Sequence, residues 1–180
     1  MGISRHRLKD GSEATIRPIA PEDKESLGVS FGQLSSGSRS RRFHSAPAGL
    51  SDRELGYLTE VDHHDHGALV AQRAATGEIL GVARFVRSAG NPALAEVEIA
   101  VFDSAQRRGL GRALMHRLVE RARQEGITAL TGVALAHNKP MFALLRGLGT
   151  TTTTRAGIGT VRLTVRLSIG DPVEDLALAA

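Results

Sequence analysis

The chain has 180 residues, of which 41% are hydrophobic and 23% are charged, values typical of one globular domain. It contains no cysteine, which excludes disulfides, cysteine-ligated zinc, iron–sulfur clusters and thiol nucleophiles. The net charge is +4, but only 3% of the residues are aromatic, so side chains that could stack on bases are scarce. We therefore expect no nucleic-acid partner.

No apolar run approaches the roughly 18–20 residues that a membrane-spanning helix needs. The first residues, MGISRHRLKDGSEATI, also lack the apolar segment of a secretory signal peptide. The sequence thus predicts a soluble cytoplasmic protein without a membrane partner. It gives no indication of an oligomeric state.

Hydrophobic periodicity and turn residues predict a mixed α/β chain. In chain order, the pattern predicts a strand over 14–19, a helix from 21 to about 34, a loop over 35–42, a helix over 52–60, strands over 68–72, 79–86 and 95–102, a helix over 111–124, a strand over 129–135, a helix over 139–148 and a final strand over 161–167. This order of elements indicates one α/β domain.

Two local signals support these boundaries. Ser51 and Glu54 have the spacing of a capping box at the start of a helix, and Gly126 lies where a left-handed C-terminal cap belongs. We expect a loose N-terminal arm over 1–13, the domain over 14–168 and a tail over 169–180. Arginines in the predicted loop, at positions 39, 41 and 42, either steer an acidic group or are simply solvated.

A glycine-containing segment, Gln106-Arg-Arg-Gly-Leu-Gly-Arg112, follows one predicted strand and opens the next helix. Two glycines spaced by one residue permit a tight turn that presents backbone N–H groups to an anion at the positive end of the helix. A structural turn would explain the glycines equally well. A dinucleotide-binding fingerprint is excluded because Leu114 stands in place of its third glycine, and no P-loop string is present.

In its context, Q-x-x-G-x-G between an acidic strand and an arginine-rich helix resembles motif A of the GNAT acetyltransferases. The resemblance extends from about Thr15 to Leu167. It implies a GNAT fold, with a mixed, mostly antiparallel sheet whose parallel fourth and fifth strands splay apart to admit acetyl-CoA. It also implies a set of cofactor-binding residues: Val101, Asp103, Gln106, Arg107, Arg108, Gly109, Leu110, Gly111, Arg112 and Asn138.

A narrower resemblance links the chain to bacterial protein lysine acetyltransferases of the Pat type. It rests on the strings SRSRRFH, LSDREL, TEVD, ALVA, GVAR and AEV, which lie between Ser38 and Val97. The resemblance implies transfer of an acetyl group from acetyl-CoA to a primary amine, with a protein lysine as acceptor. Two alternatives remain open: a small-molecule amine as acceptor, or a module that binds acyl-CoA without turnover.

Two glutamates are the candidate catalytic residues. Strand geometry places Glu96 and Glu98 on one face of the predicted strand 95–102, where mutual repulsion and burial would raise their pKa values and suit them to proton removal. Alternatively, both point to solvent or meet arginines. The Pat-type resemblance implies that Glu96 is the base, and we expect Glu98 to adjust its neighbour's pKa by like-charge repulsion.

The sequence departs from the GNAT pattern at the usual tyrosine that protonates the leaving thiolate. Leu145 occupies that place, so the thiolate leaves without a donor or another group, such as His137, serves. The string Asp62-His-His-Asp-His66 contains metal-ligand residue types, but adjacent residues in one loop cannot all converge on one ion. We therefore expect no metal there and interpret the string as a solvated turn.

Overall fold

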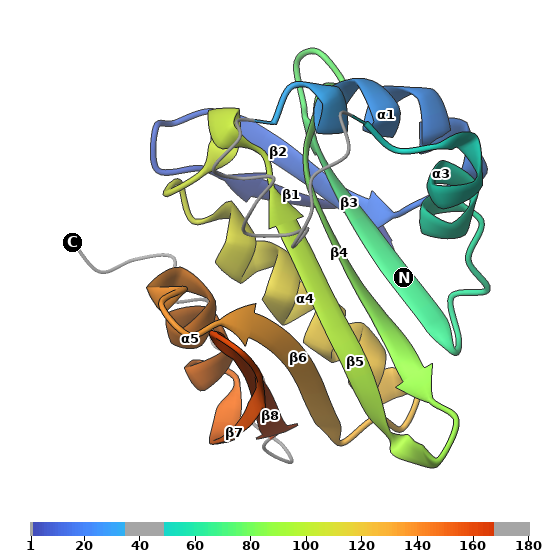
Figure 1. The fold of residues 1–180 in the computed structure, drawn as a ribbon. Helices are drawn as coiled ribbons and strands as arrows, with labels where there is room; N and C mark the ends of the chain where they lie inside the picture. The colour runs from blue at the N-terminus through green and yellow to red at the C-terminus, as the bar shows by residue number, and fades with distance from the viewer. Residues whose placement is uncertain (1, 35–48, 168–180) are drawn as a thin grey trace.

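An eight-stranded sheet forms the centre of the computed structural model, which describes residues 2–34 and 49–167 (Figure 1). The strand order is β1-β2-β3-β4-β5-β6-β8-β7, and every neighbouring pair is antiparallel except β5 and β6. The strands are β1 (Ser4–Arg7), β2 (Glu13–Pro18), β3 (His66–Arg73), β4 (Ile79–Ser88), β5 (Asn91–Val101), β6 (Ala129–Leu135), β7 (Gly149–Gly157) and β8 (Thr160–Leu167).

Helices cover both faces of this sheet. On one face lie α1 and α3, which pack against each other, and on the other lies α4, with α5 against the last two strands (Figure 1). Short 3₁₀ turns, η1 and η2, precede α1 and α4. The bounds are η1 (Pro21–Asp23), α1 (Lys24–Gly32), α3 (Asp52–Thr59), η2 (Asp103–Ala105), α4 (Leu110–Gln124) and α5 (Lys139–Arg146).

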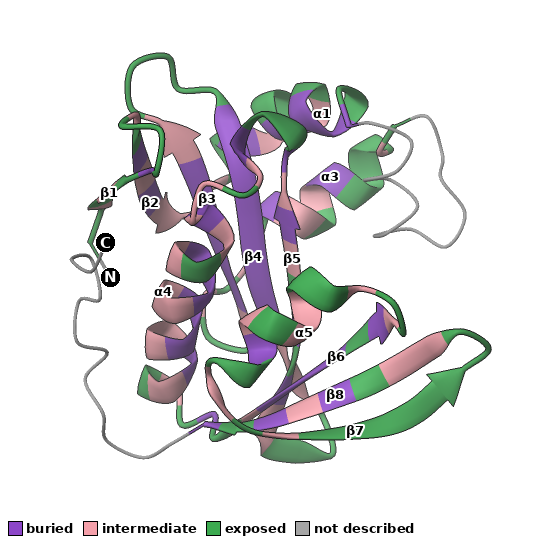
Figure 2. Cartoon of the chain, turned by 90° about the vertical axis from the view of Figure 1, so that its left-hand side faces the viewer, coloured by how far each residue is buried: buried purple, intermediate pink, exposed green. Residues whose placement is uncertain are grey.

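Two apolar clusters hold these layers together. The cluster under α4 contains the buried helix residues Leu114, Leu118 and Ala122, which form the apolar face of this helix. The cluster under α1 and α3 includes Leu27 and Phe31. Because β4 lies between the two clusters, most of this strand is buried, as Figure 2 shows.

Most predicted elements are present, and the domain is an α/β domain. Ser51 and Glu54 make the predicted capping box: the Ser51 hydroxyl accepts from the Glu54 N–H at 3.3 Å and the Glu54 carboxylate accepts from the Ser51 N–H at 2.8 Å. Gly126 has the left-handed φ of 76° expected of a C-terminal cap. The predicted loop 35–42, its three arginines and the tail 169–180 lie outside the described residues.

The prediction of a loose arm over residues 1–13 is wrong. Ser4–Arg7 form β1, which pairs antiparallel with β2 at the edge of the sheet. The turn that follows is anchored to the glycine segment, because the Lys9 N–H donates to the Arg108 C=O at 3.2 Å and the Arg108 side chain forms an ion pair with Asp10. Polar, alternating residues suit an edge strand as well as a free arm, and composition alone does not distinguish them.

No helix of the described residues is long and apolar enough to cross a membrane.

Candidate active site

The pairing between β5 and β6 is short, and it opens a gap in the sheet. Leu94–Glu96 pair in parallel with Ala129–Thr131, and no further pair is recorded along these two strands within the described residues. Beyond this point β6 stays paired with β8 as far as Leu135. The two strands therefore diverge towards their carboxyl ends, as the GNAT resemblance predicts for the parallel pair.

Backbone groups of β5 face this gap. Phe102 donates its N–H to the Leu80 C=O of β4 at 2.9 Å. Because successive residues of an antiparallel strand point their N–H and C=O groups to alternate sides, those of Val101 point away from β4, to the side of β6. This is the orientation that a strand-like ligand would need in order to pair with Val101.

The glycine segment turns sharply at the same end of β5. Gly109 has a φ of 89°, a conformation that glycine adopts without strain, and Arg107, two residues before it, has a φ of 61°. Gly109 is the N-cap of α4 and has no side chain that could satisfy the N–H groups of the first helical turn. Those N–H groups and the helix dipole favour an anion at this point.

The predicted cofactor-binding residues around the turn differ in their burial and in their contacts. Gln106 supports the turn, since its Nε2 donates to the Val101 C=O at 3.0 Å and to Asp103 Oδ1 at 2.9 Å. Leu110 is fully buried in the core, so only its backbone can face a ligand. Arg107 and Arg112 are exposed beside the turn, whereas Arg108 forms the ion pair with Asp10.

The two later positions of the GNAT pattern are Asn138, at the start of α5, and Leu145, near its end. Asn138 is the N-cap of this helix and its Oδ1 accepts from the Met141 N–H at 3.3 Å. Leu145, at the place of the usual tyrosine, is buried in the core at 1% exposure. His137 is exposed just before α5. The role of Asn138 in cofactor binding stays a prediction.

Glu96 and Glu98 lie on the same face of β5, the face covered by α1 and α3, as strand geometry predicts. Both are exposed, so the burial that we expected of them is not found. Glu98 lies opposite Arg84 of β4, with its Oε2 3.4 Å from Arg84 Nε. Its charge is thus partly offset by an arginine, in line with the alternative interpretation, and Glu96 is the carboxylate next to the β5–β6 pairing.

A group of polar side chains that was not predicted from the sequence lies beside these glutamates. Arg84 is buried at 4% exposure, the ring of Tyr57 from α3 lies 4.5 Å from its guanidinium carbon, and the ring of His66 lies 5.1 Å from that of Tyr57. The available signal was a single charge inside the otherwise apolar string ILGVARFV.

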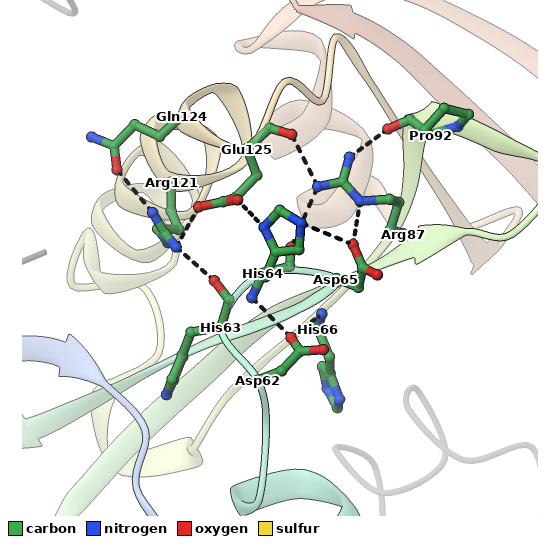
Figure 3. Close-up of polar contacts among 10 residues, drawn as sticks. All are labelled: Asp62, His63, His64, Asp65, His66, Arg87, Pro92, Arg121, Gln124 and Glu125. Atoms are coloured by element: carbon green, nitrogen blue, oxygen red, sulfur yellow. Dashed lines mark hydrogen bonds and ion pairs between the residues drawn. The ribbon is translucent and has the colours of Figure 1, made fainter.

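The segment Asp62–His66 is a bend before β3 in which Asp62, His64 and Asp65 are exposed, as predicted, and hydrogen bonds also tie it to its neighbours (Figure 3). Asp62 Oδ1 accepts from the N–H groups of His64 and His66, each at 2.8 Å. The His64 ring contacts the Glu125 carboxylate at the end of α4, and Arg87 donates to Asp65 Oδ1 at 2.6 Å and to the Glu125 C=O at 2.9 Å. Among the described residues no cluster has the arrangement of a metal site.

The split in the sheet, the glycine turn at the start of α4 and the carboxylate of Glu96 all lie along β5 of this α/β domain. Residues 36–150 match the acetyltransferase (GNAT) family. Acetyltransferase Pat of Mycolicibacterium smegmatis is 34% identical over 143 residues, which cover 79% of this chain and 43% of that protein. Acetyltransferase PA5475 of Pseudomonas aeruginosa is 30% identical over 144 residues, 79% of this chain and 77% of that protein.

The chain belongs to the GNAT acetyltransferase family. A similar solved structure is the GNAT domain of S. lividans PAT, with 31% identity and a TM-score of 0.83 over 92% of this chain and 97% of that one. These findings confirm the predicted fold and the resemblance to Pat-type acetyltransferase domains. The chain spans less than half the length of the M. smegmatis relative.

Proposed function

We propose that this chain is an acetyl-CoA-dependent N-acetyltransferase whose acceptor is a primary amine, namely a protein lysine. The observation that carries the proposal is the gap between β5 and β6, which ends at the glycine turn and begins beside Glu96. An extended ligand with an anionic end fits this layout. Its anion would lie at the N-terminus of α4 and its extended arm along the backbone of β5.

In this arrangement Glu96 removes the proton from the acceptor ammonium group. A lysine amine has an ordinary pKa of about 10.4, so near neutral pH it must lose a proton before it can attack. The neutral nitrogen then attacks the thioester carbonyl carbon, the C–S bond breaks and the thiolate leaves with CoA. The products are an amide and, after the thiolate takes up a proton, free CoA.

Hydrogen-bond donors on the backbone of β5 would stabilise the negative charge that develops on the thioester oxygen. The turn residues Arg107 and Arg112 add positive charge near the anionic end of the ligand. The buried Leu145 offers no proton for the thiolate, so we assign no general acid. A thiolate is a weak enough base to leave without one.

Support for a protein acceptor comes from the relatives, since both the M. smegmatis protein and the S. lividans domain carry the name Pat. A small-molecule amine is the alternative acceptor.

The decisive experiment measures release of free thiol from acetyl-CoA with purified lysine-containing proteins and with a panel of small amines. We expect acceptor-dependent release that is larger with proteins. Release confined to small amines would assign the alternative acceptor, and the absence of release in all cases, with acetyl-CoA still bound, would leave only a binding module.

A further inference from the structure

Arg84 is the most unusual polar side chain in the described part of the chain. It belongs to a strand that lies between two apolar clusters, and its exposure is 4%. Two of its donor atoms, Nε and Nη1, are buried and have no hydrogen-bond partner. The nearby Glu98 carboxylate, with Oε2 3.4 Å from Nε, forms an ion pair with Arg84 but no hydrogen bond to these two donors. Burying these donors without hydrogen bonds is costly, because they have lost water and the ion pair replaces it only in part.

A second residue near Arg84 also has a buried polar atom without a hydrogen-bond partner. His66 Nε2 is buried without a hydrogen-bond partner, and His66 lies on the same face of the sheet, one strand away. Burial, with the nearby Arg84 charge, lowers the pKa of the His66 imidazole, so the ring is neutral near pH 7 and has one N–H to donate. Two side chains on one face of the sheet therefore carry buried polar atoms that lack hydrogen bonds.

We propose that Arg84, assisted by His66, binds a carboxylate that the acceptor substrate carries in addition to its amine. A carboxylate is the planar acceptor that matches the paired donors of a guanidinium. This inference rests on the proposed function, because it adds a specificity site to the same acceptor pocket.

Strand geometry sets the distance between this site and the reacting amine. Arg84 lies opposite Glu98, and Glu96 is one step diagonally along the sheet, which separates the two positions by about 7–8 Å. The amine and the carboxylate of the acceptor must therefore be several bonds apart. An amino acid that carries both groups on one carbon is too short, whereas a lysine beside an acidic residue and a long ω-amino acid both fit.

Tyr57 controls access to the site. Its ring lies over the guanidinium, with the centroid 4.5 Å from the guanidinium carbon, yet 57% of the residue is exposed. The ring can turn aside without opening the apolar core, and the carboxylate then replaces it as the neighbour of Arg84.

The first experiment compares two acceptors that differ only in charge: ε-aminocaproate and its carboxamide. For the unaltered protein we expect kcat/KM to be about tenfold or more higher for the carboxylate, the worth of one charge-assisted hydrogen bond. Arg84→Gln should abolish the preference. Arg73→Gln is the matched control, because Arg73 pairs with Glu78 in the β3–β4 hairpin, away from the site; it should keep the preference.

Arg84→Lys covers the case in which Arg84→Gln fails to fold, since it keeps the charge but loses the paired donors. We expect this variant to melt near the temperature of the unaltered protein and to lose most of the preference. Equal kcat/KM values for the two acceptors with the unaltered protein would overturn the inference, as would a full preference in Arg84→Lys.

Peptides identify the source of the carboxylate. An acceptor lysine followed by aspartate is compared with the same peptide carrying asparagine. A preference in the peptides indicates an acidic side chain next to the acceptor lysine, and a preference confined to ε-aminocaproate indicates a free amino acid. If no acceptor releases thiol, the proposed function fails, but the carboxylate site can still be tested by calorimetry. Tighter binding of ε-aminocaproate than of its carboxamide, lost in Arg84→Gln, would support the site; equal binding would overturn it.

Discussion

At the scale of single residues, the proposed reaction assigns the general base to the carboxylate of Glu96. We predict that Glu96→Gln lowers kcat by ~10²–10⁴-fold, the usual contribution of a general base, with the KM for acetyl-CoA little changed. Steady-state kinetics with a fixed acceptor would measure both constants. Glu98→Gln is the matched comparison on the same face of β5, and it should cost less because Glu98 already pairs with Arg84. A larger loss in Glu98→Gln would reverse the assignment.

Gly111 gives a separate test of the anion site. A Cβ at this position would meet only Val101 Cγ2 at 3.5 Å and Ile99 Cδ1 at 3.9 Å, which are ordinary contacts, so the fold should tolerate a side chain. We predict that Gly111→Val weakens acetyl-CoA binding by about tenfold, or about 1.4 kcal/mol, by crowding the backbone where the pyrophosphate approaches. Calorimetry with a parallel melting curve would show whether affinity falls while the fold persists.

At the scale of elements, one ion pair fixes the start of α1 to β2. Arg17 donates to both oxygens of Asp23, at 2.8 and 2.6 Å, and Asp23 Oδ2 also accepts from the Ala20 N–H at 2.9 Å. Asp23 is buried at 5% exposure, and burial alone would raise its pKa. The hydrogen bonds from Arg17 and Ala20 outweigh that effect, so the pKa of Asp23 lies below its usual value.

A lowered carboxyl pKa stabilises the fold above the pKa of the unfolded chain, and this stability is lost as the pH falls through the folded value. We predict that Asp23→Asn lowers the free energy of unfolding by about 2–3 kcal/mol near pH 7, because it leaves Arg17 without its charge partner. The difference between the two proteins should shrink below about pH 4. Urea titrations at several pH values measure this, and a constant difference down to pH 2 would contradict it.

Most elements of the fold were predictable because their signals are local. The Ser51 capping box, the alternation in β5 and the apolar stripe of α4 each depend on neighbours in sequence. The edge strands β1 and β7 were not placed, since polar or threonine-rich segments acquire strand structure only from their partners. The Arg84 cluster was missed for a similar reason, as Tyr57, His66 and Glu98 come from three separate elements.

At the scale of the whole molecule, acetyl-CoA should stabilise the domain, because it binds the folded chain and has no site on the unfolded one. At a ligand concentration of about 100 times Kd, the gain is about 2.7 kcal/mol. For a domain of this size that corresponds to a rise in Tm of about 5–10 °C. Scanning calorimetry with and without ligand would measure it, and Gly111→Val should show a smaller rise at the same ligand concentration.

The short seam between β5 and β6 also has a consequence for the order in which the molecule comes apart. Among the described residues, three ladder pairs join β5 to β6 and thus the sheet half β1–β5 to the half β6–β8, and they bring together segments that are distant in sequence. Contacts of this kind tend to form late in folding. A ligand that contacts both halves acts on the native state rather than on the transition state. Acetyl-CoA should therefore slow unfolding and leave the folding rate nearly unchanged, which the two arms of a chevron plot would show.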